Sequence, residues 1–225
     1  MAQRIINATK APALALTPTQ FSQVHFDLFN NQLRVYFNTL DAFTAILSNA
    51  DGGSSLSFPH IAASDSTDQV ATGNDTPTAI NFNTLDSGLG WTLNSPGSAT
   101  AGYSGVYTIR YSLQFVNTDN AIHSAVVWLK VNGVDLANSA TEFSVPARKS
   151  AGVPSYIAGY SEVTFEINLG DDIELYWATD LAGNPTVPTA GVYIYHDTAQ
   201  TVPYARPAIP SALLNVAVNA SNVLK

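Results

Sequence analysis

The sequence predicts a mainly β protein, an all-β sandwich or barrel preceded by one long α-helix. Two observations carry this prediction. Residues 20–48 contain no Gly or Pro and repeat apolar side chains at helical spacing. From Phe58 to His196 the chain is rich in β-branched and aromatic residues, and turn clusters such as TGND, SGLG and NTDN divide it into short runs. Short alternating runs between frequent turns are typical of antiparallel β domains.

Four segments are expected along the chain. Their boundaries follow from changes in composition and hydrophobic period: an arm at 1–17, a helix at 18–50, a β domain at 55–197, and a C-terminal arm at 198–225. The last segment is Pro-rich at first and then alternates Leu214, Val216 and Val218, so it is expected to end in a strand. A free strand with that much apolar surface must be covered by its own domain, a neighbouring copy or a partner.

The helix is expected to start at Thr17-Pro18, because Thr suits the N-cap, Pro suits the first helical position, and Gln20 completes a capping box. A seam with alternating spacings of three and four residues follows, and it consists of Phe26, Phe29, Leu33, Tyr36, Leu40, Phe43 and Leu47. This heptad pattern is typical of helices that pack side by side. Two interpretations stay open: a helix that lies on its own domain, and a self-associating stalk that anchors or trimerises the chain.

Alternation and turn signals place the expected strands, at 77–84, 105–116, 122–131, 140–146, 155–168, 172–178 and 190–196. Asn132-Gly133 predicts a two-residue hairpin turn, which is the strongest local signal in the chain. The strand GVYTIRYSLQF has an unusually aromatic face, formed by Tyr107, Ile109, Tyr111, Leu113 and Phe115. These side chains must pack against either the subunit core or another subunit.

Composition favours an assembly over a free monomer. Only 12% of the 225 residues are charged, against about 25% in typical soluble proteins. The net charge of −8 and the scattered basic residues argue against nucleic-acid binding, which needs a concentrated basic surface. No run approaches the ~20 apolar residues of a membrane span, and the N-terminus lacks a signal-peptide core. We therefore expect that the protein is made in a cytoplasm and does not insert into a membrane.

Candidate chemistry is sparse, and the chain is expected not to be an enzyme and to need no cofactor. There are no cysteines, and the four histidines lie on separate elements, without a zinc-binding pair. Glu162 and Glu166 on one strand face could suggest a glycosidase pair, but a solvated β face gives the same spacing without a cleft and is the favoured interpretation. Calcium could be held by three carboxylates near one turn, Asp171, Asp172 and Glu174, although a Gly-Asp-Asp turn accounts for the same residues.

The run Gly105-Val-Tyr107-Thr-Ile109-Arg-Tyr111 resembles the G-x-Y-x-F-x-[FY] strand of the tumour necrosis factor and complement globular head superfamily. Further pieces follow in the order found in its bacteriophage branch: SDSTDQVA, PTAINFNT, VVWLKVNGVDLANS and DDIELYW. The resemblance implies a ten-stranded jelly roll that assembles as a homotrimer. It also implies aromatic contacts between copies, for which the candidates are Tyr107, Ile109, Tyr111, Tyr160, Tyr193 and Tyr195.

The flanks FDLFNNQLRVYFNTLDAF and ARPAIPSALLNVAVN resemble those of phage structural proteins that carry this domain. The function this implies is a trimeric virion knob, capsid decoration or tail-fibre appendage, which docks on a capsid or tail protein through its N-terminal region. The alternative is an adhesin in which the same trimer binds a host receptor or glycan through loops 85–103, 147–155 and 179–190. In either case the protein would be located in the virion.

Overall fold

The structure is a computed structural model, which describes residues 12–13, 19–48, 58–94, 96–187 and 189–221. The chain divides into two units, one that ends at Ser57 and one that begins at Phe58. The first unit contains the helix and the second contains all the strands that the structure describes.

Helix α1 (Gln23–Ser48) begins later than the sequence signals suggested. Residues 19–22 are not helical, and the Ser22 Oγ accepts a hydrogen bond from the His25 backbone N–H, so Ser22 is the N-cap. The expected cap at Thr17-Pro18 lies outside the described residues, as does the expected end of the helix at residue 50. The helix therefore begins after Ser22, which the sequence analysis did not predict as a cap.

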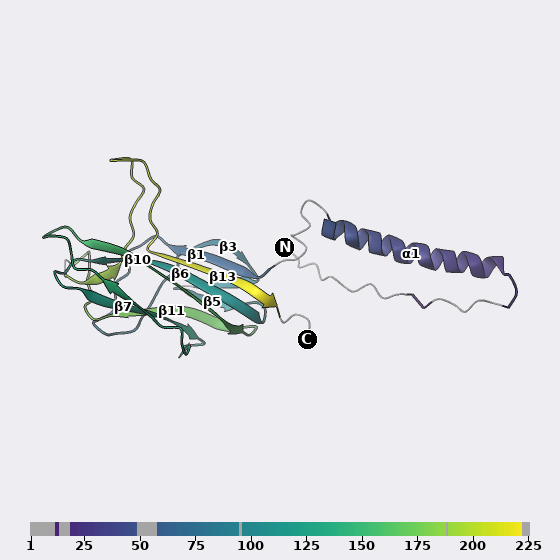
Figure 1. Cartoon of the computed structure of the whole chain (residues 1–225), viewed down its shortest axis with the longest axis horizontal. Coiled ribbons are helices and arrows are strands. Elements are labelled where there is room, and N and C mark those ends of the chain that lie inside the picture. The colour runs from purple at the N-terminus through teal and green to yellow at the C-terminus, as the bar shows by residue number, and fades with distance from the viewer. Residues whose placement is uncertain (1–11, 14–18, 49–57, 95, 188, 222–225) are drawn as a thin grey trace. The chain divides into compact units, whose positions relative to one another are not determined.

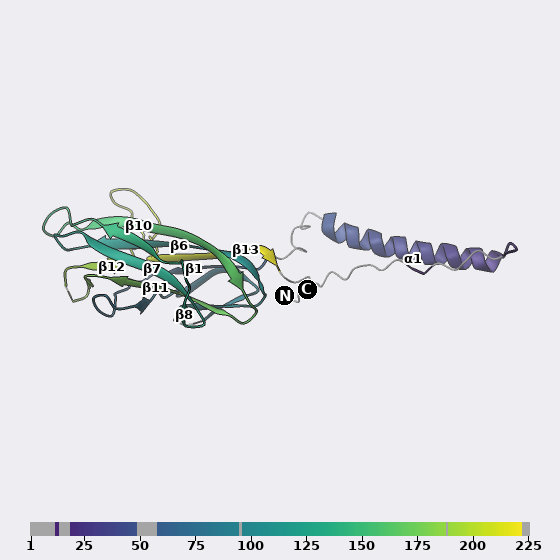
Figure 2. The same ribbon diagram turned by 60° about the horizontal axis from the view of Figure 1, so that its bottom comes forward.

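The second unit is a sandwich of two antiparallel sheets (Figures 1 and 2). Sheet A has the order β10-β6-β13-β1-β3, with β12 pairing beside β6, and comprises β1 (His60–Asp65), β3 (Thr84–Leu89), β6 (Gly105–Asn117), β10 (Ser155–Ile167), β12 (Val192–Ile194) and β13 (Ala212–Ser221). Sheet B has the order β4-β5-β11-β7-β8, and in addition β2 pairs with β11 and β9 pairs with β7. Its strands are β2 (Thr78–Ala79), β4 (Trp91–Asn94), β5 (Ser98–Ala101), β7 (His123–Val131), β8 (Val134–Asp135), β9 (Thr141–Val145) and β11 (Asp172–Thr179).

The connections make this sandwich a jelly roll. The main strands in chain order are β1, β5, β6, β7, β9, β10, β11 and β13. The first, third, sixth and eighth of these lie in sheet A, and the second, fourth, fifth and seventh lie in sheet B. A chain whose eight main strands are divided between two sheets in this way forms the double Greek key of a jelly roll. The expected mainly β sandwich with one preceding helix is therefore confirmed.

The aromatic face of β6 forms the centre of the core. Tyr107, Tyr111 and Phe115 are almost completely buried between the sheets. Tyr107 packs edge-on against Trp91 of β4, with ring centroids 5.1 Å apart, and Phe115 lies 6.0 Å from Trp177 of β11. Edge-to-face and tilted contacts of this kind add to the hydrophobic free energy of burial. The aromatic side chains of β6 therefore join sheet A to the tryptophans of sheet B.

The C-terminal segment is part of the β domain rather than an arm outside it. Strand β13 lies between β1 and β6, and its register pairs Val216 with Ile61 on one side and with Ile109 on the other. Val216 is completely buried. The expected boundary at residue 197 is therefore corrected, because the sandwich includes residues up to Ser221.

The hairpin turn predicted at Asn132-Gly133 is confirmed. Asn132 and Gly133 both have positive φ, at 52° and 76°, and Val131 pairs directly with Val134, as a two-residue hairpin requires. The strand expected at 77–84 is mostly irregular, since only β2 forms there before β3 begins. Strands β1, β3, β4 and β5 were not among the expected ones.

Candidate assembly surfaces

The outer face of sheet A carries few charges in its central rows. Its register aligns three rows across β10, β6, β13, β1 and β3, which are Tyr160–Ser112–Leu213–Ser64–Thr84, Glu162–Arg110–Asn215–Ala62–Ser87, and Thr164–Thr108–Ala217–His60–Leu89. The charged groups in these rows are Arg110 and Glu162, which form an ion pair with each other. Most of the remaining positions hold Ser, Thr, Ala or Asn, and the larger side chains among them are Tyr160, Leu213, His60 and Leu89. Another protein surface could approach the small side chains closely.

Tyrosines gather at one end of the same face. Tyr156 and Tyr193 both pair with Val116, from opposite sides, and the Tyr195 ring lies 5.2 Å from that of Tyr156. Tyr160 lies on the same face, four residues further along β10. Tyr156 and Tyr160 are 52% and 57% exposed. We call this surface, with Tyr156, Tyr160, Tyr195 and Leu213, the tyrosine face.

A hairpin from Asp197 to Ile209 projects from the sandwich beside this face (Figure 1). Backbone hydrogen bonds pair Asp197 with Ile209 and Gln200 with Arg206, and the Arg206 guanidinium forms an ion pair with the Asp197 carboxylate. The tip carries Val202 and Tyr204, which are 78% and 67% exposed. The base of the hairpin is therefore well fixed, while apolar side chains at its tip are presented to solvent.

The predicted contact residues divide between the core and the surface. Tyr107, Ile109 and Tyr111 are buried inside their own subunit, so they do not form a surface that another copy could touch, and their assignment to contacts between copies is corrected. The physical reason is that sheet B covers these side chains within one subunit, as where Trp91 packs against Tyr107. Tyr160 and Tyr195 lie on the tyrosine face, and Tyr193 lies beneath it, largely buried.

The predicted contact residues did not include Tyr156 and Leu213. Leu213 is 42% exposed on the outer face, while its neighbours Ala212 and Leu214 point into the core. The period of two in β13 would have placed Leu213 opposite Leu214, had the segment been recognised as a central strand. The signal available in the sequence was Leu213 itself, a large apolar residue out of phase with the row Leu214, Val216 and Val218.

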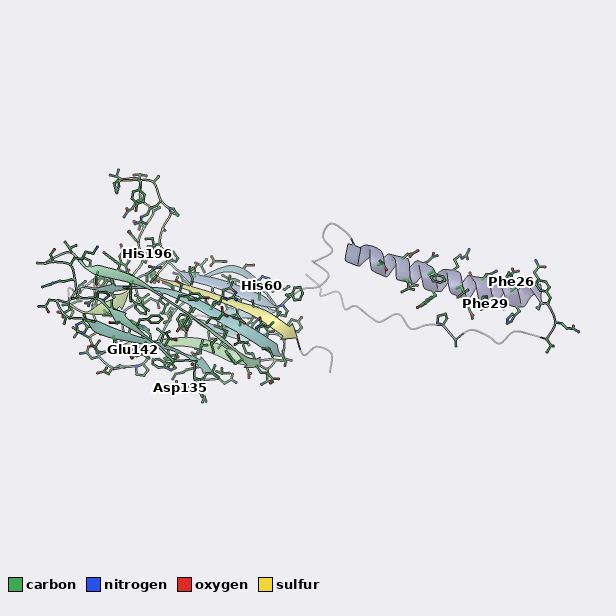
Figure 3. All side chains as sticks on the ribbon, in the orientation of Figure 1. Phe26, Phe29, His60, Asp135, Glu142 and His196 are labelled. Atoms are coloured by element: carbon green, nitrogen blue, oxygen red, sulfur yellow. The ribbon has the colours of Figure 1, made fainter. Side chains whose placement is uncertain are left out.

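Helix α1 carries the predicted seam and much additional apolar surface. Phe26 and Phe29 project from the helix in Figure 3. The seam residues Leu33, Tyr36 and Leu40 are half-buried, whereas Val24, Leu28, Val35 and Phe37 are exposed on other sides of the helix. The side chains of Phe43 and Leu47 lie outside the described part of the structure. The apolar side chains of the helix therefore lie on more sides than packing against a single neighbouring element would cover.

The acidic candidates have structural partners. Glu162 pairs with Arg110, and that hydrogen bond holds the pKa of Glu162 below its usual range. The carboxylate of Asp171 accepts hydrogen bonds from the Asn132 side chain and the Asn168 backbone, which keeps its own pKa low. Asp172 accepts from Thr100, and Glu174 lies opposite Lys130 in the register of β11 and β7. Within the described ranges, no three His, Cys, Asp or Glu side chains come together as a metal site.

The four histidines are separate, and Figure 3 shows His60 and His196 at different places on the domain. His60 bonds to the Phe58 carbonyl and the Ser87 hydroxyl. His123 lies between two carboxylates, with Nδ1 2.9 Å from Asp180 and Nε2 3.1 Å from Asp119. This arrangement joins the loop after β6 to the end of β11. In the described part of the chain, no helix has the length and hydropathy needed to cross a bilayer.

Comparisons with known proteins give similarity of structure but not of sequence. No protein-family model matches the chain, and no curated protein sequence matches it. Among solved structures, the chain is similar to Eiger TNF from S. frugiperda, with 11% identity, a TM-score of 0.45, and coverage of 73% of this chain and 94% of that chain. It is also similar to murine APRIL at pH 5.0, with 15% identity, a TM-score of 0.44, and coverage of 72% of this chain and 99% of that chain.

Proposed function

We propose that this chain is a non-enzymatic structural protein that assembles as a homotrimer through the tyrosine face. The observation that carries the proposal is the composition of that face, which combines exposed tyrosines and Leu213 with small uncharged side chains and a single internally paired charge pair in its central rows. Depletion of charge together with aromatic enrichment is what distinguishes the core of a protein interface from ordinary surface.

Two further features support association between copies. The tip of the hairpin at 197–209 exposes Val202 and Tyr204 on a rigid base next to the tyrosine face. Helix α1 exposes apolar side chains on several sides and carries a heptad seam, so it supplies a second surface for packing between helices. In a chain with only 12% charged residues, covering these surfaces would also keep the protein soluble.

The test places a charge at the centre of the tyrosine face. Leu213→Glu introduces a carboxylate between Ser112 and Ser64, where burial against another copy would leave it unpaired. Val134→Glu is the control, because Val134 is also an exposed apolar residue, at 70% against 42% for Leu213, but lies in the β7–β8 hairpin of sheet B. Size-exclusion chromatography with light scattering should give a trimer mass for the wild type and for Val134→Glu, and a monomer mass for Leu213→Glu.

A monomeric wild type would overturn the proposal. So would a Leu213→Glu variant that keeps the trimer mass, because the interface would then lie elsewhere. Circular dichroism of Leu213→Glu must match the wild type, which separates dissociation from unfolding. Leu213 points away from the core, so the variant is expected to fold.

We propose the virion of a bacteriophage as the setting, with the trimer serving as a knob, capsid decoration or small tail appendage. This part rests on the resemblance of residues 58–197 and of both flanks to phage structural proteins. The N-terminal region, including α1, would dock on a capsid or tail protein. A cryo-EM map of the parent particle tests the proposal directly, and a particle that lacks density for this chain would refute it.

The second candidate is an adhesin that uses the same trimer to bind a host receptor or glycan. The specific observation in its favour is a surface pocket formed by two of the three loops named for this role, 147–155 and 179–190. Purified trimers that bind host cells and block infection would favour adhesion. Trimers that bind only to emptied particles would favour decoration.

A further inference from the structure

A pocket of about 380 Å³ opens at the end of the sandwich, beside the tyrosine face. It lies between the loop before β10 and the loop before β12, and its wall includes Arg148, Val153, Pro154, Asn184, Pro185 and Tyr193. Sites for small molecules are commonly of this size, with mostly apolar walls and a few polar groups that fix the ligand. The lining of this pocket has that mixture.

Among the arginines in the described part of the jelly-roll unit, Arg148 is the one that forms no ion pair with an acidic side chain. Arg110 forms an ion pair with Glu162 and Arg206 forms one with Asp197, whereas no carboxylate in the described residues forms an ion pair with Arg148. The acidic side chains of the adjoining segments, Asp119 and Asp180, are both bound by His123 instead. In a protein with a net charge of −8, a guanidinium without a counter-ion is available for a ligand anion.

The protein holds this guanidinium in place at the edge of the pocket. One terminal N–H of Arg148 donates to the Thr118 carbonyl at 3.3 Å, and its backbone N–H donates to the Asp119 carbonyl at 2.8 Å. The remaining N–H groups of the guanidinium are the donors that can reach a bound carboxylate. Arg is suited to this task because its planar fork matches the two oxygens of a carboxylate.

The opposite wall is built by a loop whose ends are closed tightly. A Cβ on Gly183 would lie 2.6 Å from backbone atoms of Gly191, so only glycine permits the two strands of the loop to approach so closely. The Asn184 side chain then accepts backbone hydrogen bonds from Thr186 and Val187 and fixes the turn beyond. The pocket is therefore preformed, and binding would not have to order the loop first.

The chemistry of the lining selects a class of ligand. The side-chain N–H groups of Asn184 and the Tyr193 hydroxyl offer hydrogen-bonding groups, while Val153, Pro154 and Pro185 offer aliphatic surface. A sugar ring presents both hydroxyl groups and an apolar C–H face, and a carboxylated sugar adds the anion that Arg148 requires. From this we infer that the pocket binds an acidic sugar, a uronic acid, through its carboxylate. The inference goes beyond the proposed assembly role and does not depend on trimer formation.

Isothermal titration with free glucuronic acid tests this inference, with glucose as the neutral control sugar. We expect saturable binding of glucuronic acid and binding of glucose that is at least about tenfold weaker, since charge-assisted hydrogen bonds are the strong ones. Arg148→Gln should weaken glucuronic acid binding at least about tenfold. Lys149→Gln removes the same charge from the adjacent exposed residue and should leave binding unchanged.

Arg148→Lys provides a second variant, which keeps the charge but loses the planar fork, and it too should bind more weakly than the wild type. The inference is overturned if glucuronic acid does not bind saturably, if Arg148→Gln binds as the wild type does, or if inorganic phosphate and sulfate displace the sugar at equal concentration. Light scattering on the same samples reports the trimer separately. A trimer that fails to bind the sugar refutes only the pocket, and a monomer that binds it refutes only the assembly.

Discussion

Replacing His123 with Gln should remove a pH-dependent part of the free energy of unfolding. The imidazole contacts the carboxylates of Asp180 and Asp119 through its two nitrogens, at 2.9 and 3.1 Å. Both nitrogens donate only when the ring is protonated, because a neutral imidazole has one donor and one acceptor. Protonated His123 therefore joins two loops that a neutral ring could bridge only on one side.

The direction of the pH dependence follows from the three pKa shifts. Burial lowers the pKa of His123, but the hydrogen bonds to Asp180 and Asp119 outweigh it, and the pKa is raised above its usual 6.5. The hydrogen bond from His123 lowers the pKa of Asp119 below 3.8. Burial by itself would raise the pKa of Asp180, but hydrogen bonds from His123 and from the Ser124 backbone outweigh burial, and the pKa of Asp180 is lowered as well. The histidine contribution is complete below about pH 6.5 and is lost as the pH rises through the raised pKa.

The carboxylates set the acid limit of the same window. Their contribution is present above about pH 4 and is lost as the pH falls through their lowered pKa values. A hydrogen bond to a charged partner contributes about 1.5–3 kcal/mol in a buried site. Because the Asp180 side chain is 45% exposed, screening by solvent reduces the contribution of His123 to about 1 kcal/mol.

Urea unfolding at pH 5.5 and pH 8.5 measures the effect. His123→Gln should lower the free energy of unfolding by about 1 kcal/mol at pH 5.5 and by less at pH 8.5. His60→Gln is the control, since His60 bonds to a carbonyl and a hydroxyl rather than to carboxylates. Equal losses at the two pH values for His123→Gln would refute the reasoning, because the lost interaction would then not involve the protonated ring.

Three further predictions concern packing and association. Gly159→Ala should destabilise the domain by about 1–3 kcal/mol in urea unfolding, because the new Cβ would lie 2.7 Å from the Phe115 ring. Tyr111→Ala should cost about 3–5 kcal/mol and unfold the subunit, so circular dichroism must change along with mass; a folded monomer would contradict its place in the core. Replacing Val202 and Tyr204 together by Ser should weaken self-association in dilution experiments while the melting curve of the diluted monomer stays unchanged, and an unaltered dissociation constant would exclude the hairpin tip from the interface.

The sequence predicts strands well where large apolar side chains alternate, and poorly where small residues do the packing. Strand β1 (HIAASD) buries Ile61 and Ala63, and β5 (SATA) buries two alanines. Ala and Ser have low strand propensity, so neither segment carries a local signal. Their strand structure comes from pairing with distant segments, which is why β1 is visible only once β13 and β3 lie on either side of it.

The same limit applies to the C-terminus. The alternation at Leu214, Val216 and Val218 predicted a strand, but the prolines before it suggested an arm outside the domain. Whether such a strand lies at an edge or at the centre depends on its partners, and those partners, β1 and β6, lie roughly a hundred residues or more away in the sequence. Periodicity shows which residues share a face of a strand, but it does not show which other strands pair with that strand.

Strand β6 shows why contacts between copies were predicted on a face that is buried within one subunit. Its alternation separates Tyr107, Tyr111 and Phe115 from Arg110 and Ser112, but a period of two does not say which face meets another subunit. Burial decides for the first set, because Trp91 and Trp177 of sheet B cover it within one chain. A face that assembles only after folding must first stay soluble, so tyrosine hydroxyls, serines and threonines suit it better than phenylalanine and isoleucine. The less hydrophobic face of the sheet is therefore the one on which to look for contacts between copies.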